Sequence, residues 1–327
     1  MKILYTSILI LVGIGTIAFT FKNTDAIKTK AALGKKLFSE KILSKDSSIS
    51  CASCHIPAYA FADTLPVSVG IHGIETSRNT PSVLNMKQRP YFYFDGRAAS
   101  LEEQSLMPIA NENEMGLPIE EAVKRLNENP VYVKLFLELY KQKPNAKNLS
   151  ASFAAYENTL ETVESRYDDW ANDKIKFTKQ EERGKDLFVG DKAKCFDCHA
   201  TDDFTTDEFK NIGLFNGNWL TDSGRYRITK KEKDLGKFKT PGLRNVAVTA
   251  PYMHSGIFNT LEEVLRYYNN PKGFFPHQIN LDTAFNKPLG LTTQEQNDII
   301  AFLKTLTDKV YLKKEVTKKV TYPKRRK

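Results

Sequence analysis

The sequence predicts a mainly α-helical protein of two domains with long loops. A five-residue pattern occurs twice, as Cys51-Ala52-Ser53-Cys54-His55 and as Cys195-Phe196-Asp197-Cys198-His199, about one domain length apart. Several segments carry apolar residues at helical spacing, whereas strand signals are few. Stretches rich in Pro, Gly, Asn and Ser separate these segments, which indicates long loops.

The repeated pattern C-x-x-C-H is the attachment motif of a c-type haem. Its two thiols form thioethers with the porphyrin, and the adjacent imidazole becomes the proximal iron ligand. A zinc site would bring its two C-x-x-C halves within about 15 to 20 residues, and a thioredoxin-like motif needs no histidine. The low cysteine density of this long chain argues against a disulfide scaffold. We therefore predict two covalent c-type haems, one on Cys51, Cys54 and His55 and one on Cys195, Cys198 and His199.

The N-terminus predicts export. After Lys2, residues 3–21 carry no charge and are strongly apolar, as in the h-region of a signal peptide. No clear small-x-small cleavage site precedes Lys22, and the apolar run approaches the roughly 20 residues that span a bilayer. Residues 1–22 are therefore predicted to be an export signal or an N-terminal anchor of a periplasmic protein, which is either released or tethered.

The formal charge of +9 is concentrated at the C-terminus, because residues 313–327 contain eight Lys or Arg and one Glu. The rest of the chain is nearly neutral, so nucleic-acid binding is not predicted. Residues 311–327 are predicted to form a solvated basic tail. Attraction of this tail to anionic lipid or to a partner surface is the alternative.

The first predicted domain covers residues 30–167. Helical spacing covers 31–37 and 120–140, and a helix at 151–167 is predicted to close this half. Residues 56–95 are predicted to form loops. A large flat apolar cofactor accounts for loops of this length, because irregular chain can pack on it.

The second predicted domain covers residues 178–310 and follows a polar stretch at 168–179. Just before the two haem motifs, Gly34-Lys35-Lys36-Leu37-Phe38 and Gly184-Lys185-Asp186-Leu187-Phe188 are near-copies. They indicate an internal repeat. We therefore predict two cytochrome c-like domains, each built around one covalent haem.

Three helices are predicted in the second half. The first, at 180–188, leads into the second haem motif as 31–38 leads into the first. The others cover 261–268 and 293–306, and the last is predicted to begin with a Thr293 cap that Gln296 completes.

The sixth iron ligand decides the function of a haem site, because two protein ligands give an electron carrier and an open or releasable site gives a catalyst. Beyond the two motif histidines, the chain offers His72, His254 and His277, with Met and Tyr as further options. The sequence Gly70-Ile71-His72-Gly73 places His72 in a glycine-flanked loop, where it could bind and then release the first iron. An exposed loop histidine is the alternative.

Further motifs follow each haem motif. The first half contains residues 70–85 with Arg78-Asn79-Thr80-Pro81-Ser82-Val83-Leu84-Asn85, then Phe94-Asp95-Gly96-Arg97-Ala98, Gln104 and Glu114-Met115. The second half contains Asp222-Ser223-Gly224-Arg225-Tyr226, Lys239-Thr240-Pro241-Gly242-Leu243-Arg244-Asn245-Val246 and Thr249-Ala250-Pro251-Tyr252-Met253-His254-Ser255-Gly256. These motifs resemble, in order, the peroxidatic half and the electron-transfer domain of bacterial dihaem cytochrome c peroxidases. The resemblance covers roughly residues 31–307.

For the first haem, the resemblance implies a low-potential peroxidatic site. His72 would be the sixth ligand that leaves on activation, and Gln104 and Glu114 would lie in the distal pocket. Glu114 would move a proton between the two peroxide oxygens, since cleavage of the O–O bond needs a base for one oxygen and an acid for the other.

For the second haem, the resemblance implies a high-potential site that receives electrons, with a methionine as the usual sixth ligand. The matching position in this chain is Tyr268. A tyrosine there is similar to the related dihaem enzyme MauG, which oxidises residues of a partner protein. A phenolate would lower the potential of this haem relative to methionine. Met253 is the alternative ligand, and an ordinary helix residue is the alternative role for Tyr268.

Two further positions follow from the resemblance. The family usually has a tryptophan before Asp-Gly-Arg, between the haems, whereas this chain has Phe94, so Tyr91 or Tyr93 is the expected substitute in electron transfer. The family also binds a calcium ion between its domains. In this chain the ligands would be the Asn79 side chain and the main-chain carbonyls of Thr249 and Pro251, an all-oxygen set that suits Ca²⁺.

The leading functional prediction is an exported peroxidase that reduces hydrogen peroxide to water. Its electrons would come from a small periplasmic donor such as a cytochrome c or a cupredoxin, and the resemblance implies a homodimer. A MauG-like oxidase of a partner protein is the first alternative. A non-catalytic dihaem electron carrier is the second, although Gln104 and Glu114 argue against it, because a carrier does not need an acid–base pair over an iron.

Overall fold

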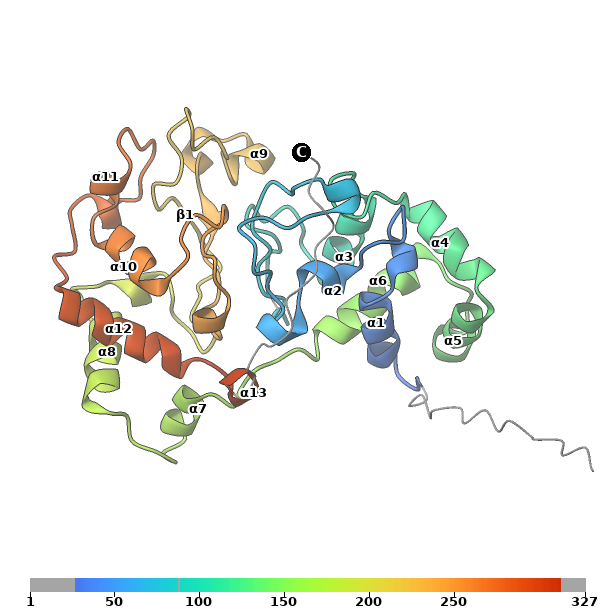
Figure 1. Ribbon diagram of the computed structural model, residues 1–327, viewed down its shortest axis with the longest axis horizontal. Helices are drawn as coiled ribbons and strands as arrows, with labels where there is room; N and C mark the ends of the chain where they lie inside the picture. Colours follow the sequence, from blue (N-terminus) through green and yellow to red (C-terminus); the bar gives the residue numbers. More distant parts are fainter. Residues whose placement is uncertain (1–26, 88, 313–327) are drawn as a thin grey trace, which may run out of the picture.

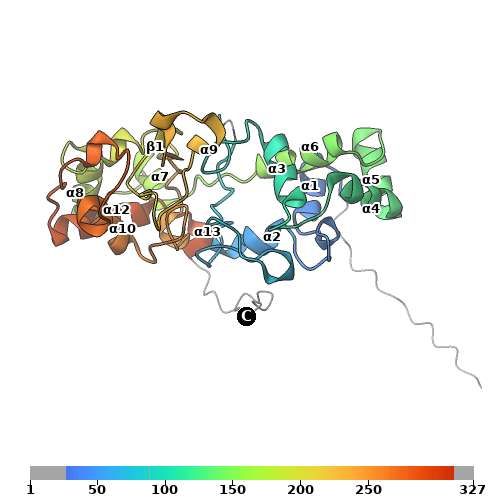
Figure 2. The same cartoon turned by 90° about the horizontal axis from the view of Figure 1, so that it is seen from above.

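The computed structural model describes residues 27–87 and 89–312, and it is mainly helical, as the sequence predicts. Figures 1 and 2 show two lobes side by side, which the two halves of the chain form. The predicted export signal at 1–22 and residues 313–327 of the predicted tail lie outside the described residues. Among the helices described, none is long and apolar enough to cross a membrane.

The helices of the first lobe pack mainly around one large apolar cluster, with a smaller cluster beside it. They are α1 (Lys30–Phe38), α2 (Cys51–Cys54), α3 (Leu101–Ala110), α4 (Ile119–Glu128), α5 (Pro130–Tyr140) and α6 (Ala146–Glu157). α1 and α6 approach closely at Gly34, where a Cβ atom would lie 1.9 Å from the carbonyl oxygen of Ser152. The described residues of the range 56–95 form only short 3₁₀ helices, turns, bends and isolated bridges, as predicted.

The second lobe repeats this arrangement. Its elements are α7 (Arg166–Ala171), α8 (Lys179–Val189), β1 (Phe209–Lys210), α9 (Tyr226–Thr229), β2 (Phe238–Lys239), α10 (Leu261–Asn269), α11 (Pro271–Phe274), α12 (Thr293–Thr305) and α13 (Lys309–Leu312). The strands pair antiparallel, with Phe209 opposite Lys239. At Gly184 of α8, a Cβ atom would lie 1.9 Å from the carbonyl oxygen of Asp298 in α12. Each of the two near-copies in the sequence therefore contains a glycine at which its helix closely approaches a second helix.

Two predicted helices are wrong in extent. The segment 120–140 forms α4 and α5, because the Asn129 side chain caps α5 and Pro130 occupies its first turn. The predicted helix at 151–167 is also broken: α6 starts earlier and ends at Glu157, and α7 starts at Arg166 behind a Ser165 cap.

Smaller differences concern a helix cap and a missed helix. The cap of α12 is Thr292 with Glu295, one residue before the predicted pair. α3 was not predicted, although Ser100 caps it and Glu102 and Glu103 occupy its first turn.

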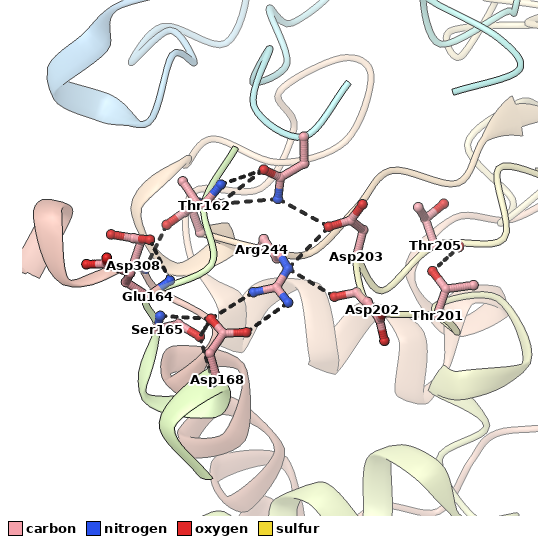
Figure 3. A network of polar contacts seen from close by, with 12 residues as sticks. Thr162, Glu164, Ser165, Asp168, Thr201, Asp202, Asp203, Thr205, Arg244 and Asp308 are labelled. Atoms are coloured by element: carbon pink, nitrogen blue, oxygen red, sulfur yellow. Dashed lines mark hydrogen bonds and ion pairs between the residues drawn. The ribbon is translucent and has the colours of Figure 1, made fainter. Parts of the chain in front are cut away.

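The segment between α6 and α7 crosses from one lobe to the other and is held by polar side chains (Figure 3). The Asn85 side-chain oxygen accepts the N–H of Thr162 at 2.8 Å, and Asn245 Nδ2 donates to Thr162 Oγ1 at 3.0 Å. Arg244 donates two hydrogen bonds of 3.0 Å to Asp168. These tertiary contacts replace the bonds that a continuous helix would make, which explains the break.

A second link between the lobes is centred on Arg78. Its guanidinium donates to both carboxylate oxygens of Asp222, at 2.6 and 2.9 Å, and to Asp95 at 2.7 Å. Burial raises the pKa of Asp222, but the hydrogen bonds and charge of Arg78 outweigh this effect and hold the pKa below its usual value.

Replacing Arg78 by methionine is expected to destabilise the protein, because the partly buried Asp222 would lose its cation and the buried Asp95 would keep only Arg97 as its partner. The expected loss is about 3 to 5 kcal/mol of unfolding free energy. Urea unfolding at pH 7 measures it. Lys124→Met removes an exposed cation and is expected to cost no more than about 1 kcal/mol. Equal losses in the two variants would contradict the role of Arg78.

Candidate haem cavity and active site

One cavity of about 890 Å³ reaches both C-x-x-C-H motifs. Its wall includes all six predicted haem-binding residues, namely Cys51, Cys54, His55, Cys195, Cys198 and His199. Much of the remaining wall is apolar and includes Phe38, Leu84, Phe153, Leu265, Ile299 and Leu303. A cavity of this size and lining suits large, flat, apolar cofactors.

Both motif histidines are oriented by a backbone carbonyl. His55 Nδ1 lies 3.1 Å from the oxygen of Phe61, and His199 Nδ1 lies 2.9 Å from the oxygen of Phe204. Such a hydrogen bond leaves Nε2 as the nitrogen available to a metal. Burial lowers the pKa of both imidazoles, which favours the neutral, ligating form. The four thiols are free, so the residues present fit two thioether-bound haems.

The first end of the cavity contains a carboxyl group and an amide. Glu114 and Gln104, the two residues predicted for a distal pocket, both line the cavity there. Burial raises the pKa of Glu114 above its usual value, although the nearby Arg97 charge and an Asn111 hydrogen bond of 2.8 Å partly offset this effect. The Asn111 hydrogen bond therefore holds the carboxyl group in place, and burial favours its protonated form more than in an exposed glutamate.

Tyr93 and Arg97 also lie at this end of the cavity, a position that the sequence did not reveal. The Tyr93 hydroxyl donates to the Gln104 carbonyl at 3.2 Å, and the Arg97 guanidinium lies 3.4 Å from the centre of the Tyr93 ring. Burial raises the pKa of Tyr93, so the phenol is neutral at pH 7.

His72 is not brought to the cavity. Its side chain is 45% exposed and its Nδ1 lies 3.6 Å from an Asp46 carboxylate oxygen. The preceding residue, Ile71, is buried in the core of the first lobe, and His72 itself has a left-handed backbone with φ of 57°. The buried Ile71 and the sharp turn carry the histidine outward. In this conformation, His55 is the only histidine of the described chain that lines the cavity at the end where the first motif lies.

Tyr268 lies in the cavity at the end of the second motif. Burial, and secondarily the neighbouring Cys198 and Cys195, raise the pKa of its hydroxyl. No hydrogen bond to this hydroxyl occurs within the described chain, whereas the adjacent Tyr267 donates to the oxygen of Ile212 at 2.6 Å. A phenol that lines the cavity without a hydrogen-bond partner in the described chain fits an axial iron ligand. Met253, the alternative, also lines the cavity.

The middle of the cavity lies at the contact between the lobes. Phe94 lines it, and its carbonyl accepts the N–H of Lys239 at 2.7 Å. His254 also lines it and stacks on Phe238, with ring centres 3.7 Å apart. Tyr91 contacts Phe209 of the second lobe at 5.3 Å. Aromatic side chains therefore gather between the two motifs.

The three predicted calcium ligands, Asn79, Thr249 and Pro251, share this wall. Asn79 donates its backbone N–H to the oxygen of His254 at 2.8 Å and its Nδ2 to two carbonyls at 3.2 Å, so its Oδ1 is left for a cation. Within the described residues, no hydrogen bond reaches the carbonyl oxygens of Thr249 and Pro251. These oxygens fit a hard cation such as Ca²⁺.

Glu157 is a buried carboxyl group on the cavity wall that the sequence analysis did not single out. A polar residue four positions after the buried Phe153, on the same face of α6, is the signal that could have identified it. No side-chain hydrogen bond to Glu157 occurs in the part of the chain described. Burial raises its pKa from 4.5 to about 8.

Glu157→Gln is expected to change the pH dependence of stability. Because the folded state retains a proton that the unfolded state releases, the wild type should lose stability as the pH rises from 4.5 to about 8. The loss is at most about 5 kcal/mol, and the variant should lack it. Unfolding free energies from pH 5 to 8 measure it, with the exposed Glu164→Gln as control. If the unfolding free energies of Glu157→Gln and wild type change in parallel with pH, this role of Glu157 is contradicted.

Comparison with known proteins identifies relatives over most of the chain. The model of the di-haem cytochrome c peroxidase family matches residues 28–176. The methylamine utilization protein MauG of Methylorubrum extorquens is 38% identical over 282 residues, which cover 85% of this chain and 78% of that protein. The cytochrome c551 peroxidase of Nitrosomonas europaea is 34% identical over 294 residues, which cover 89% and 82%.

Solved structures show the same architecture. A MauG-like protein associated with microbial copper homeostasis superimposes with a TM-score of 0.80 and 32% identity, over 86% of this chain and 90% of that one. The dihaem peroxidase BthA of Burkholderia thailandensis superimposes with a TM-score of 0.76 and 26% identity, over 86% and 87%. The relatives therefore include both peroxidases and MauG proteins.

Proposed function

Because this chain belongs to the di-haem cytochrome c peroxidase family, we propose that it reduces hydrogen peroxide to water with electrons from a small periplasmic redox protein. Haem is the cofactor of this family of oxidoreductases, which act on peroxide. The observation that carries the proposal is Glu114, which has a raised pKa and lies on the cavity wall that also contains the first haem motif.

Each haem is proposed to be covalent, on the cysteine pairs 51 and 54 and 195 and 198, with His55 and His199 as proximal ligands. When bound, the first haem supplies the iron that binds and reduces peroxide. Glu114 takes a proton from one peroxide oxygen and returns it to the other. Asn111 holds the Glu114 carboxylate, and the Gln104 amide can hydrogen-bond the bound peroxide.

The second haem is proposed to receive electrons, with Tyr268 as its sixth ligand. A calcium ion on Asn79, Thr249 and Pro251 would stiffen the contact between the lobes. We further propose haem domains at 30–167 and 178–310, export to the periplasm and assembly as a homodimer. His72 would serve as the releasable ligand of the first iron only in a conformation in which the turn at 70–74 points inward.

A MauG-like oxidase of a partner protein is the second candidate. Two observations favour it: Tyr268 lies in the cavity without a hydrogen-bond partner in the described chain, and His72 points away from it. A closed electron carrier is disfavoured, because Glu114 and Gln104 occupy the first end of the cavity.

Steady-state peroxide consumption by the haem-loaded protein tests the proposal, with a reduced small cytochrome c as donor. The oxidised and half-reduced enzymes are compared. Fast turnover supports the peroxidase, and a requirement for prior half-reduction would support a releasable His72. Little turnover in either state, together with a long-lived spectral change on adding peroxide, would contradict the peroxidase function and favour oxidation of a partner protein.

A further inference from the structure

An apolar surface with fixed geometry lies on the second lobe. Trp219 is 53% exposed and Ile279 is 41% exposed. The side-chain oxygen of Asn216 accepts the backbone N–H groups of residues 218, 219 and 220 at 3.1, 3.2 and 3.0 Å, which fixes the turn that carries Trp219. Ile279 N–H donates to the oxygen of Phe215 at 3.1 Å and so lies beside this turn. The exposed indole is therefore preorganised rather than loosely attached.

A chain of ring contacts connects this indole with the cavity. Trp219 meets Phe275 at 5.0 Å, and Phe275 meets Tyr267 at 5.6 Å between ring centres. Tyr267 meets Tyr268 at 6.0 Å, and Tyr268 lines the second end of the cavity. Because electron tunnelling weakens steeply across empty gaps, packed side chains couple the surface to this end of the cavity better than solvent would.

A basic segment borders the apolar surface. Residues 227–233 contain four cations and one carboxylate: Arg227, Lys230, Lys231 and Lys233 against Glu232. All are exposed, and none of the four cations forms an ion pair within the described chain. Asn280 Nδ2 donates to the oxygens of Lys233 and Leu235 at 3.2 and 3.0 Å, which joins this segment to the neighbouring Ile279. The surface is therefore an apolar centre with a positively charged border.

Building on the proposed function, we propose that Trp219, Ile279 and the basic segment 227–233 form the docking site of an acidic electron-donor protein. An exposed tryptophan is a favourable anchor, and the unpaired cations attract and orient a partner of opposite charge. Each docking event transfers one electron from the donor to the second haem. Two such electrons and two protons convert one hydrogen peroxide molecule to two water molecules.

The charge of the donor is tested with two forms of one protein. A basic mitochondrial-type cytochrome c and the same protein with succinylated, hence acidic, lysines are compared as reduced donors. We expect the KM for the acidic form to be at least about tenfold lower, and its oxidation to slow as the salt concentration rises. Equal KM values, or a preference for the basic form, would overturn the proposal.

The location of the site is tested with matched variants. Trp219→Ala and the double variant Lys231→Glu with Lys233→Glu should each raise the KM for the acidic cytochrome about tenfold. They should also weaken its binding to the oxidised enzyme in calorimetric titrations. Val163→Ala and the double variant Lys134→Glu with Lys143→Glu, which change exposed residues elsewhere, should leave both values unchanged. If the control variants raise the KM and weaken the binding as much as the docking variants do, the site is refuted.

A small uncharged dye donor, tetramethyl-p-phenylenediamine, separates the two proposals. Its oxidation by peroxide needs no protein docking, so all of these variants should retain it. If the wild type fails with the dye, the peroxidase function itself is wrong. If dye oxidation persists while the two cytochromes behave alike, only the docking site is wrong.

Discussion

Glu114→Gln is expected to lower peroxide turnover by about 10²- to 10⁴-fold, the range typical of a lost general acid–base group. The glutamine amide keeps the size of the side chain but cannot take a proton from peroxide. Haem content and both haem spectra should stay unchanged, because Glu114 is not among the proposed haem ligands. The turnover number with a reduced cytochrome donor measures the effect, and the exposed Glu112→Gln is the matched control.

The pH profile distinguishes a proton-transfer role from a structural one. Burial raises the pKa of Glu114 above 4.5, and only the ionised carboxylate can act as a base. Turnover should therefore fall as the pH drops through this raised pKa, and that acid limb should be absent in Glu114→Gln. A variant with lowered turnover but an unchanged acid limb would assign the proton transfer to another group.

Tyr268→Met is expected to raise the potential of the second haem by on the order of 0.1 V or more, within the roughly 0.8 V range that axial ligands cover. Thioether sulfur stabilises ferrous iron, whereas an anionic phenolate stabilises ferric iron. Spectroelectrochemical titration of the haem-loaded protein measures the change. The absorption and electron-paramagnetic signatures of the oxidised second haem should change as well.

The neighbouring tyrosine provides the control for this prediction. Tyr267→Phe removes the hydrogen bond to the Ile212 carbonyl, so it should cost about 1 kcal/mol of stability without a comparable shift in potential. If Tyr268→Met leaves the potential unchanged while Met253→Leu shifts it, Met253 is the ligand. A shift in neither variant would exclude both residues as the sixth ligand.

Much of the local structure could be predicted from short patterns. The helices α8, α10 and α12 were expected close to their observed positions, because amphipathic spacing and capping residues act within a few residues. The repeat around Gly34 and Gly184 was visible as near-copies, and the structure gives it a physical reason, since both glycines allow a helix to approach another backbone.

The candidate site was predictable only in part. Gln104, Glu114 and Tyr268, which the resemblance singles out, lie on the cavity wall, but the orientation of His72 did not follow from its sequence. Its neighbour Ile71 is buried in the core, and that burial turns the histidine toward Asp46. The role of Glu157 was also hidden, since its carboxyl group is unusual only because α6 places it on the cavity wall.

By itself, the sequence determined the two haem motifs, the family and the helical character, because each depends on residues close together in the chain. Only the tertiary structure decided which distant groups meet. Arg78 reaches Asp222 across 144 positions, and the exposed Trp219 is linked to Tyr268 by rings from separate segments. Such contacts depend on how the two lobes and their loops pack, and packing is a property of the whole chain, which no short pattern specifies.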